Sequence, residues 1–201
     1  MTGAHPEQPA DTERFDTGGR ATGWVGLVLC VFLAVGWWVL PGGPLPGWVL
    51  SGAVLSGLLF WSAIIRPSVS ATGDTLVLRN MFEDVRIPLA AIQEHAVRQV
   101  LAVRVADKRY VGSGIGRSFA ASRSTRVPAP DGGATRGIHP ADYVETRIAG
   151  LAADARDRAR VRHRSEEQAA LAADVERTPT WRVIGPLAVS LVALAVSIAL
   201  A

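Results

Sequence analysis

The sequence predicts a membrane protein that combines transmembrane helices with a small antiparallel β-sheet, and three observations lead to this fold class. Residues 22–65 and 183–201 contain no charged side chain, although the chain has 21 basic and 18 acidic residues. The hydrophobic content of 49% is high for an ordinary soluble domain. Beyond Arg66 and Pro67 the chain changes to short runs of alternating apolar and polar residues, which is the pattern of half-buried strands.

The first 21 residues are expected to form a disordered N-terminal tail. A cleaved signal peptide fits this region poorly, because the region is long and contains the acidic residues Glu7, Asp11, Glu13 and Asp16. The helix that follows is therefore expected to remain part of the protein.

Residues 22–40 and 47–65 are predicted to be two transmembrane helices that form a hairpin, residues 22–65 in all. A helix of 19 residues is roughly 28 Å long, close to the hydrocarbon thickness of a bilayer. Residues 41–46, with the sequence PGGPLP, interrupt the helix because proline lacks the amide donor and clashes with the preceding turn. A buried helical hairpin of a soluble protein is the alternative, but an uncharged pair of this length is hard to bury in so small a chain.

The tryptophans provide an independent indication of these boundaries, because indole rings prefer the headgroup level of a membrane. All six stand near the end of a predicted span and are expected to be membrane-interface anchors: Trp24, Trp37, Trp38, Trp48, Trp61 and Trp181. Trp181 precedes a third predicted span, residues 183–201. Pro186 lies in the first turn of this span, where a missing N–H is tolerated.

The orientation follows from the basic residues beside the spans, because positive charge is retained on the cytoplasmic side. The residues expected to set the topology are Arg14, Arg20, Arg66, Arg79, Arg177 and Arg182. The connection at 41–46 and the C-terminus carry no basic residue. We therefore expect a multi-pass protein of the cytoplasmic membrane, with the N-terminus and residues 66–182 in the cytoplasm and the C-terminus outside.

Residues 66–117 are predicted to form a β domain of five or six antiparallel strands. Residues 69–72 and 75–78 flank Gly73 and Asp74, a two-residue connection typical of a tight hairpin. A third strand at 85–87 ends at Pro88, an alternating run covers 95–105, and a last strand covers 109–111.

These residues resemble a known family. RPSVSATGDTLVLRN at 66–80, then VRIPLAAI, the turn ADKR and YVGSGIG are similar to the bacterial pleckstrin-homology-like (PH-like) domains of the actinobacterial low-molecular-weight antigen 6 type. The resemblance implies a partly open barrel of bent antiparallel strands, a preceding two-helix membrane hairpin and no known enzymatic activity. The turn at residues 71–75 departs from phosphoinositide-binding relatives, because it contains an acid and no base, whereas phosphate recognition needs clustered donors.

Residues 118–138 are expected to be a flexible linker and residues 139–177 a long cytoplasmic helix. Val144, Ile148, Leu151 and Ala155 form one apolar stripe of that helix. Arginine then recurs at every second position, at Arg156, Arg158, Arg160, Arg162 and Arg164. On a helix this period scatters charge around the cylinder, so a solvated surface is one interpretation and contact with anionic lipid headgroups is the other.

The sequence shows no pattern that points to catalysis. Cys30 has no partner cysteine, the four histidines are scattered, and residues 112–116 with the sequence GSGIG lack the third glycine of a dinucleotide loop. We expect no enzyme, cofactor, metal, nucleic acid or small-molecule substrate. The predicted function is a membrane-anchored interaction or scaffolding protein, whose partners are the bilayer and an unknown membrane or cytoplasmic protein, a second copy of the chain included. Its exposed strand edges are the expected docking sites. The alternative is a sensor of anionic lipid surfaces through residues 156–164.

Overall fold

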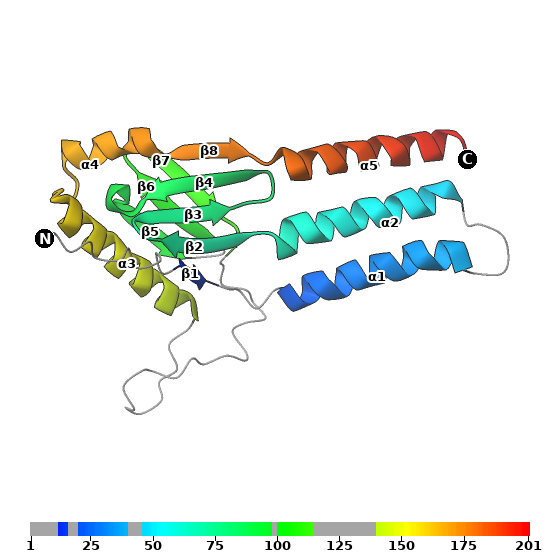
Figure 1. Cartoon of the computed structure of the whole chain (residues 1–201), viewed down its shortest axis with the longest axis horizontal. Helices are drawn as coiled ribbons and strands as arrows, with labels where there is room; N and C mark the ends of the chain where they lie inside the picture. Colours follow the sequence, from blue (N-terminus) through cyan, green and yellow to red (C-terminus); the bar gives the residue numbers. More distant parts are fainter. Residues whose placement is uncertain (1–11, 16–19, 40–45, 98–99, 115–139) are drawn as a thin grey trace, which may run out of the picture. The chain divides into compact units, whose positions relative to one another are not determined.

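A computed structural model describes residues 12–15, 20–39, 46–97, 100–114 and 140–201 of the chain, and it shows a mixed fold of helices and antiparallel sheet (Figure 1). These residues divide into two compact units. The helical unit takes its described residues from 20–67, 80–84 and 178–201, and the β-rich unit from 12–15, 68–79 and 85–177.

The helical unit contains three apolar helices, α1 (Arg20–Val39), α2 (Gly47–Phe60) and α5 (Trp181–Ala199). α2 continues as one π-helical turn, η1 (Trp61–Ile65). Two of these helices, Gly47–Ile65 and Trp181–Ala199, are long and apolar enough to cross a membrane; the corresponding apolar run in α1, Arg20–Gly36, is shorter. Residues 41–45 of the predicted connection lie outside the described residues.

The β-rich unit contains two antiparallel sheets. The first has five strands in the order β1-β2-β3-β4-β8, and the second has three in the order β5-β6-β7. Their bounds are β1 (Thr12–Phe15), β2 (Ser68–Thr72), β3 (Thr75–Arg79), β4 (Glu83–Pro88), β5 (Glu94–Val97), β6 (Leu101–Val105), β7 (Lys108–Gly112) and β8 (Glu176–Pro179). The 3₁₀ turn η2 (Leu89–Ala91) joins the first sheet to the second along the chain.

The described residues of the β domain predicted at 66–117 form six strands, β2 to β4 in the first sheet and β5 to β7 in the second. β2 and β3 pair with Thr72 opposite Thr75, and Gly73 at the turn has a φ of 56°, which glycine adopts without strain. The alternating run at 95–105 is not one strand but two, β5 and β6, with Val97 opposite Leu101. Alternation alone does not reveal this break, because both arms of a hairpin keep the same period of two.

The hydrophobic core of the β-rich unit lies where the sheets meet the helix α3 (Pro140–Ala159). Strand residues such as Leu78, Ile87 and Val103 are fully buried there. α3 contributes one stripe to the same core: Val144, Ile148, Ala152 and Ala155 are buried, with Leu151 packed at the margin. The apolar stripe predicted for this helix therefore covers the core of the unit.

Two predicted domain boundaries are wrong. Residues 12–15 of the expected tail form β1, because Phe15 is buried in the core and the strand pairs with β2 along its whole length. Residues 139–177 are not one helix: α3 ends at Ala159, and α4 (Glu166–Ala170), the 3₁₀ turn η4 (Leu171–Asp174) and β8 follow. The predicted linker at 118–138 lies outside the described residues.

The break after α3 has a local cause. Arg160 and Arg164 have φ angles of 55° and 59°, so the backbone turns through left-handed conformations that cannot continue an α-helix. The hydroxyl of Ser165 then accepts a hydrogen bond from the amide of Gln168 and caps α4. The series Arg156–Arg164 therefore spans a helix end and a turn, and does not decorate one helix.

Candidate membrane-interface site

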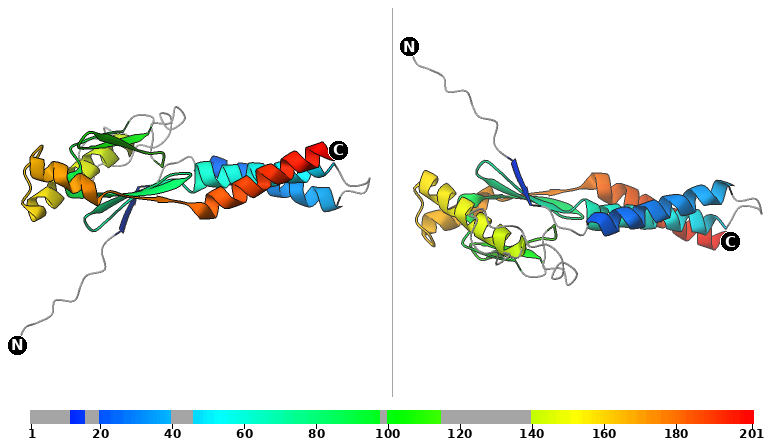
Figure 2. Two further views of the ribbon diagram at one scale, coloured as in Figure 1. Left: turned by 90° about the horizontal axis from the view of Figure 1, so that it is seen from above. Right: turned by 90° about the horizontal axis from the view of Figure 1, so that it is seen from below.

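The three apolar helices pack side by side with α2 in the middle, as Figures 1 and 2 show. Glycines allow α1 to approach α2 closely: a Cβ atom on Gly26 would lie 2.7 Å from the Phe60 ring. On the other side, the hydroxyls of Ser51 in α2 and Ser197 in α5 are 2.9 Å apart. In both pairs the beginning of one helix lies against the end of the other, so α1 and α5 each run antiparallel to α2.

This antiparallel packing gathers the basic residues of the helical unit at one end. Arg20 is the first residue of α1, Arg66 follows η1, and Arg182 is the second residue of α5. We call this the basic end. At the opposite end, the described residues in the last turn of α1, the first turn of α2 and the last turn of α5 contain no charged side chain.

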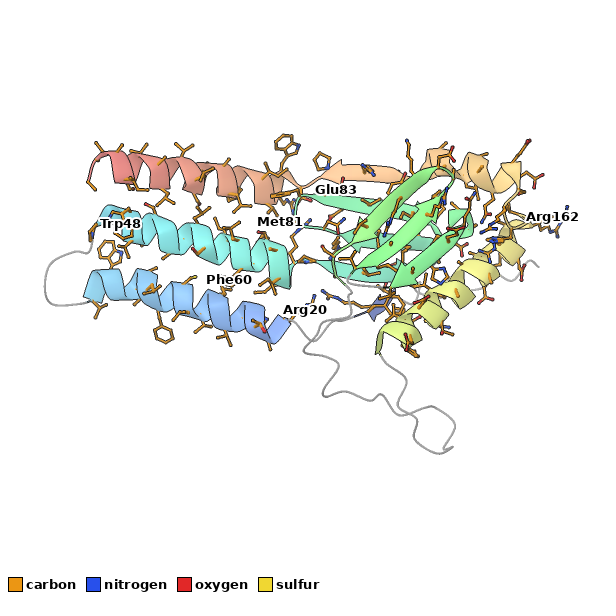
Figure 3. All side chains as sticks on the ribbon, turned by 180° about the vertical axis from the view of Figure 1, so that it is seen from behind. Arg20, Trp48, Phe60, Met81, Glu83 and Arg162 are labelled. Carbon is orange, nitrogen blue, oxygen red and sulfur yellow. The ribbon has the colours of Figure 1, made fainter. Side chains whose placement is uncertain are left out.

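The tryptophans lie at the same two levels. Trp24, Trp61 and Trp181 belong to the basic end, and their exposed fractions are 54%, 38% and 70%. Trp38 and Trp48 belong to the opposite end, where they are 78% and 45% exposed (Trp48 is labelled in Figure 3). The side chain of Trp37 lies outside the described residues. Two exposed aromatic levels separated by apolar helix are the arrangement that a bilayer favours.

Arg66 forms the polar centre of the basic end. Its side chain is only 11% exposed, and its Nη2 donates to Asp84 Oδ1 and to Thr180 Oγ1, both at 2.8 Å. Its Nη1 donates to the carbonyl of Met81 at 3.3 Å. A guanidinium with several fixed donors suits such a cluster better than an ammonium would. We call Arg66, Met81, Asp84 and Thr180 the Arg66 cluster.

The Arg66 cluster joins three chain segments that are distant in sequence. It ties the end of η1 to the turn between β3 and β4 and to the residue that precedes α5. The amide of Thr180 also donates to the carbonyl of Phe82 at 2.8 Å. The boundary between uncharged and charged sequence identifies Arg66, but nothing in the sequence identifies Asp84 and Thr180 as its partners, because they are far away in the chain.

Of the other residues predicted to set the topology, Arg182 belongs to the basic end, whereas Arg14, Arg79 and Arg177 belong to the β-rich unit. Arg14 in β1, Arg79 at the end of β3 and Arg182 in α5 are all exposed. The guanidinium of Arg177 lies 4.9 Å from the centroid of the buried Tyr110 ring, a cation–π contact. Arg177 thus has a packing role within the β-rich unit.

The arginine series at 156–164 is largely occupied inside the β-rich unit. Arg156 donates to the carbonyl of Ile92 at 3.2 Å, Arg158 pairs with Asp74, and Arg164 pairs with Glu94 at 2.6 Å. Within the described part of the chain, Arg160 and Arg162 have no ion pair; Figure 3 shows Arg162 pointing away from the ribbon. The sequence suggests five arginines available to a lipid surface, whereas in the structure three of the five already bind other groups of the protein.

A buried glutamine holds the segment that follows this series. Gln168 is fully buried, and its amide nitrogen donates to the carbonyls of Ala90 at 2.8 Å and Ile92 at 3.1 Å. Its Oε1 accepts a hydrogen bond from the amide of Arg164 at 2.6 Å. These contacts fasten α4 to the turn η2. The sequence gives no signal for this role, because most glutamines are exposed.

The outer face of β5, β6 and β7 carries an open groove of about 710 Å³. The strand registers place Glu94, Arg104 and Arg109 in one cross-strand row and Ala96, Ala102 and Val111 in the next. Arg104 lies 3.7 Å from Glu94, which also binds Arg164. The groove therefore combines a small apolar strip with two arginines, Arg104 and Arg109, and one acid, Glu94.

The edge of this sheet at β5 is covered, contrary to the expectation of exposed strand edges. The amide of Val97 donates to Glu145 Oε2 at 3.4 Å, and His95 Nε2 lies 3.1 Å from the Glu145 carbonyl oxygen. In the first sheet, the edge strand β8 is exposed along its length but has only four residues and ends in Pro179. Short strands and proline discourage further strand pairing.

Among the described residues, no group of three or more His, Cys, Asp and Glu side chains could hold a metal ion. Cys30 is buried in the helical unit, beside Gly57. Comparison of the chain with protein-family models, curated proteins and solved structures finds no match.

Proposed function

We propose that the chain is a membrane-anchored interaction protein without catalytic activity, in which α1, α2 and α5 each cross the membrane. The observation that supports this topology is the pairing within the first sheet. β1 precedes α1, β2 follows η1 and β8 precedes α5, yet the three strands belong to one sheet. One sheet lies in one compartment, so the three helix ends beside it belong on the same side of the membrane.

The basic end of the helical unit supports the cytoplasm as that compartment. Arg20, Arg66 and Arg182 adjoin the helix ends that lead into the sheet, whereas the described residues of the opposite end are uncharged. Positive charge beside a span is retained in the cytoplasm. The N-terminus and residues 66–182 are then cytoplasmic, and residue 201 is outside.

A reporter fused after Ala201 tests this topology. We expect a periplasmic reporter such as alkaline phosphatase to be active there and inactive when it is inserted after Gly150, an exposed position of α3. A cytoplasmic reporter such as green fluorescent protein should give the reverse pattern. Equal compartments for the two positions would show that α5, the proposed span between them, does not cross the membrane, and would contradict the topology.

The arrangement of the β-rich unit supports its resemblance to PH-like domains. Four strands in the order β1-β2-β3-β4 precede a second antiparallel sheet of three, and both are followed along the chain by α3, which packs on the common core. α3 has the position expected of the capping helix of such domains. β8 is an addition to the first sheet, and β1 is separated from β2 by the two apolar helices.

We propose the groove over β5, β6 and β7 as the surface that binds a protein partner. Its lining includes the two arginines Arg104 and Arg109 and one acid, Glu94, which Arg164 also binds. The complementary surface is therefore acidic, with small apolar side chains at its centre. Protein interfaces commonly combine an apolar centre with a polar rim. A second copy of the chain is one candidate for this partner.

A photo-crosslinking amino acid at Ala96, within the groove, tests this function in intact membranes. We expect a discrete adduct from Ala96, much less adduct from the exposed position Asp154 of α3, and loss of the Ala96 adduct with Arg109→Glu. An adduct at twice the chain mass would identify a second copy. Adducts of equal kind and yield from Ala96 and Asp154, unaffected by the charge reversal, would refute the groove as a docking site.

The alternative function, sensing of anionic lipid through residues 156–164, has less support. Arg156, Arg158 and Arg164 are already bound to groups of the protein. The two remaining arginines, Arg160 and Arg162, would contribute only about 1 kcal/mol each near an anionic surface.

A further inference from the structure

The turn between β3 and β4 exposes an aromatic side chain beside the apolar helices. Asn80 N donates to the carbonyl of Glu83 at 2.9 Å, which closes the turn around Met81 and Phe82. Phe82 is 50% exposed, and Met81 is half-buried. All four residues of the turn belong to the helical unit, not to the unit that contains most of the sheet.

The backbone of this turn is held at the basic end. The carbonyl of Met81 accepts from Arg66, and the carbonyl of Phe82 accepts from the amide of Thr180. The carboxylate of Asp84 is bound by the same Arg66. Figure 3 shows Met81 beside the start of α5. The turn therefore has a determined position relative to the ends of η1 and α5.

The surroundings of Phe82 have the composition of a membrane interface. Thr180, whose amide binds the Phe82 carbonyl, directly precedes the exposed Trp181, and Trp61 is exposed on η1 at the same end. Tryptophan and tyrosine concentrate at the headgroup level of a bilayer, so Trp61 and Trp181 mark this level at the end of the unit where the turn is held. Transfer of the exposed half of the Phe82 ring from water into this region removes apolar surface from water, which is favourable.

We infer that the Met81–Phe82 turn enters the headgroup region of the bilayer and forms a fourth membrane contact beside the three helices. This inference rests on the proposed membrane crossing of those helices. The Arg66 cluster then fixes the depth of the turn, because Arg66 holds the turn from one side and Thr180 from the other. The partner is the lipid surface itself, and the contact ties the turn between β3 and β4 to the membrane.

Depth-dependent quenching tests this contact in the full-length chain. In a Cys30→Ala background, an environment-sensitive fluorophore is attached to Met81→Cys, and the protein is reconstituted in phosphatidylcholine and phosphatidylglycerol vesicles that contain spin-labelled lipids. Arg86→Cys, on the exposed side of β4, is the aqueous control, and Gly185→Cys in α5 is the membrane control. We expect several-fold stronger quenching at residue 81 than at residue 86, and a marked decrease at residue 81 when Phe82→Asp is added.

The controls separate failure of this inference from failure of the proposed anchoring. A fluorophore at residue 81 that is quenched no more than at residue 86, while residue 185 is strongly quenched, would overturn the membrane contact of the turn but leave the helices in the bilayer. The absence of quenching at residue 185 would overturn both. A blue-shifted but unquenched signal at residue 81 would mean that protein covers the turn, which also overturns the inference.

Discussion

Replacement of Gly114 by alanine is expected to lower the stability of the β-rich unit by about 3 kcal/mol or more. A Cβ atom at this position would lie 2.6 Å from the Cα and 2.7 Å from the amide nitrogen of Ser68. Ser68 is buried at the start of β2, opposite Arg79 of β3. Backbone atoms cannot rotate away as a side chain can, so the beginning of β2 or the segment after β7 has to move.

Thermal unfolding of the purified full-length chain in detergent measures this effect. A loss of this size should lower the Tm by about 6–12 °C. Gly150→Ala is the matched control, because Gly150 is an exposed residue of α3 with no atom within 4 Å of its added Cβ. Alanine there favours the helix by up to about 1 kcal/mol, so the Tm should stay equal or rise. The prediction fails if both variants unfold at the wild-type temperature.

Arg66→Leu is expected to destabilise the basic end of the helical unit by about 2–4 kcal/mol. Leucine fills the space of the methylene groups but removes the donors to Asp84, Thr180 and Met81. Asp84 is one-third exposed, so water compensates part of its loss, and the cost is lower than for a fully buried ion pair. The turn that carries Phe82 then loses its hydrogen bond from Arg66 and keeps the one from the amide of Thr180.

Two further variants distinguish the Arg66 cluster from a general effect of charge. Arg182→Leu removes the same charge from the same end, but Arg182 is exposed and has no ion-pair partner among the described residues, so little change is expected. Arg66→Lys keeps the charge, but its ammonium cannot reach all three acceptors. The stability of this variant should therefore lie between those of the wild type and Arg66→Leu. The rate of hydrogen exchange at the amides of residues 81–84 should increase from the wild type to Arg66→Lys and again to Arg66→Leu. Equal effects of Arg66→Leu and Arg182→Leu would show that the cluster adds nothing beyond charge.

The elements that sequence analysis predicts well are those with a strong local pattern. Uncharged runs of helix length predict α2 with η1 and α5, and the Gly73-Asp74 connection predicts the pairing of β2 with β3. The apolar stripe of α3 is predicted because Val144, Ile148 and Ala155 recur at helical spacing on the face that the core buries. In these cases the cause of the structure lies within a few residues of the chain.

The elements that the prediction misses depend on distant partners. β1 has four residues and β8 has four, too few for a periodic signal, and each exists because a neighbouring strand offers it backbone hydrogen bonds. The end of α3 is missed because the chain around Arg160 contains no proline or glycine. The turn there depends on the left-handed backbone conformation of Arg160 and Arg164 and on the cap at Ser165. Such weak local preferences are readily overridden by tertiary contacts.

The same division applies to the candidate site. The sequence alone determines that two long segments are free of charge and that Arg66 marks the boundary of one of them, because hydropathy and charge are properties of the residues themselves. Only the tertiary structure decides that Arg66 binds Asp84 and Thr180, that the carbonyl of Phe82 accepts from the amide of Thr180, and that three of the five arginines at 156–164 are engaged. Those facts depend on chain segments that meet only after folding, since a side chain has no fixed neighbours until the backbone around it is in place.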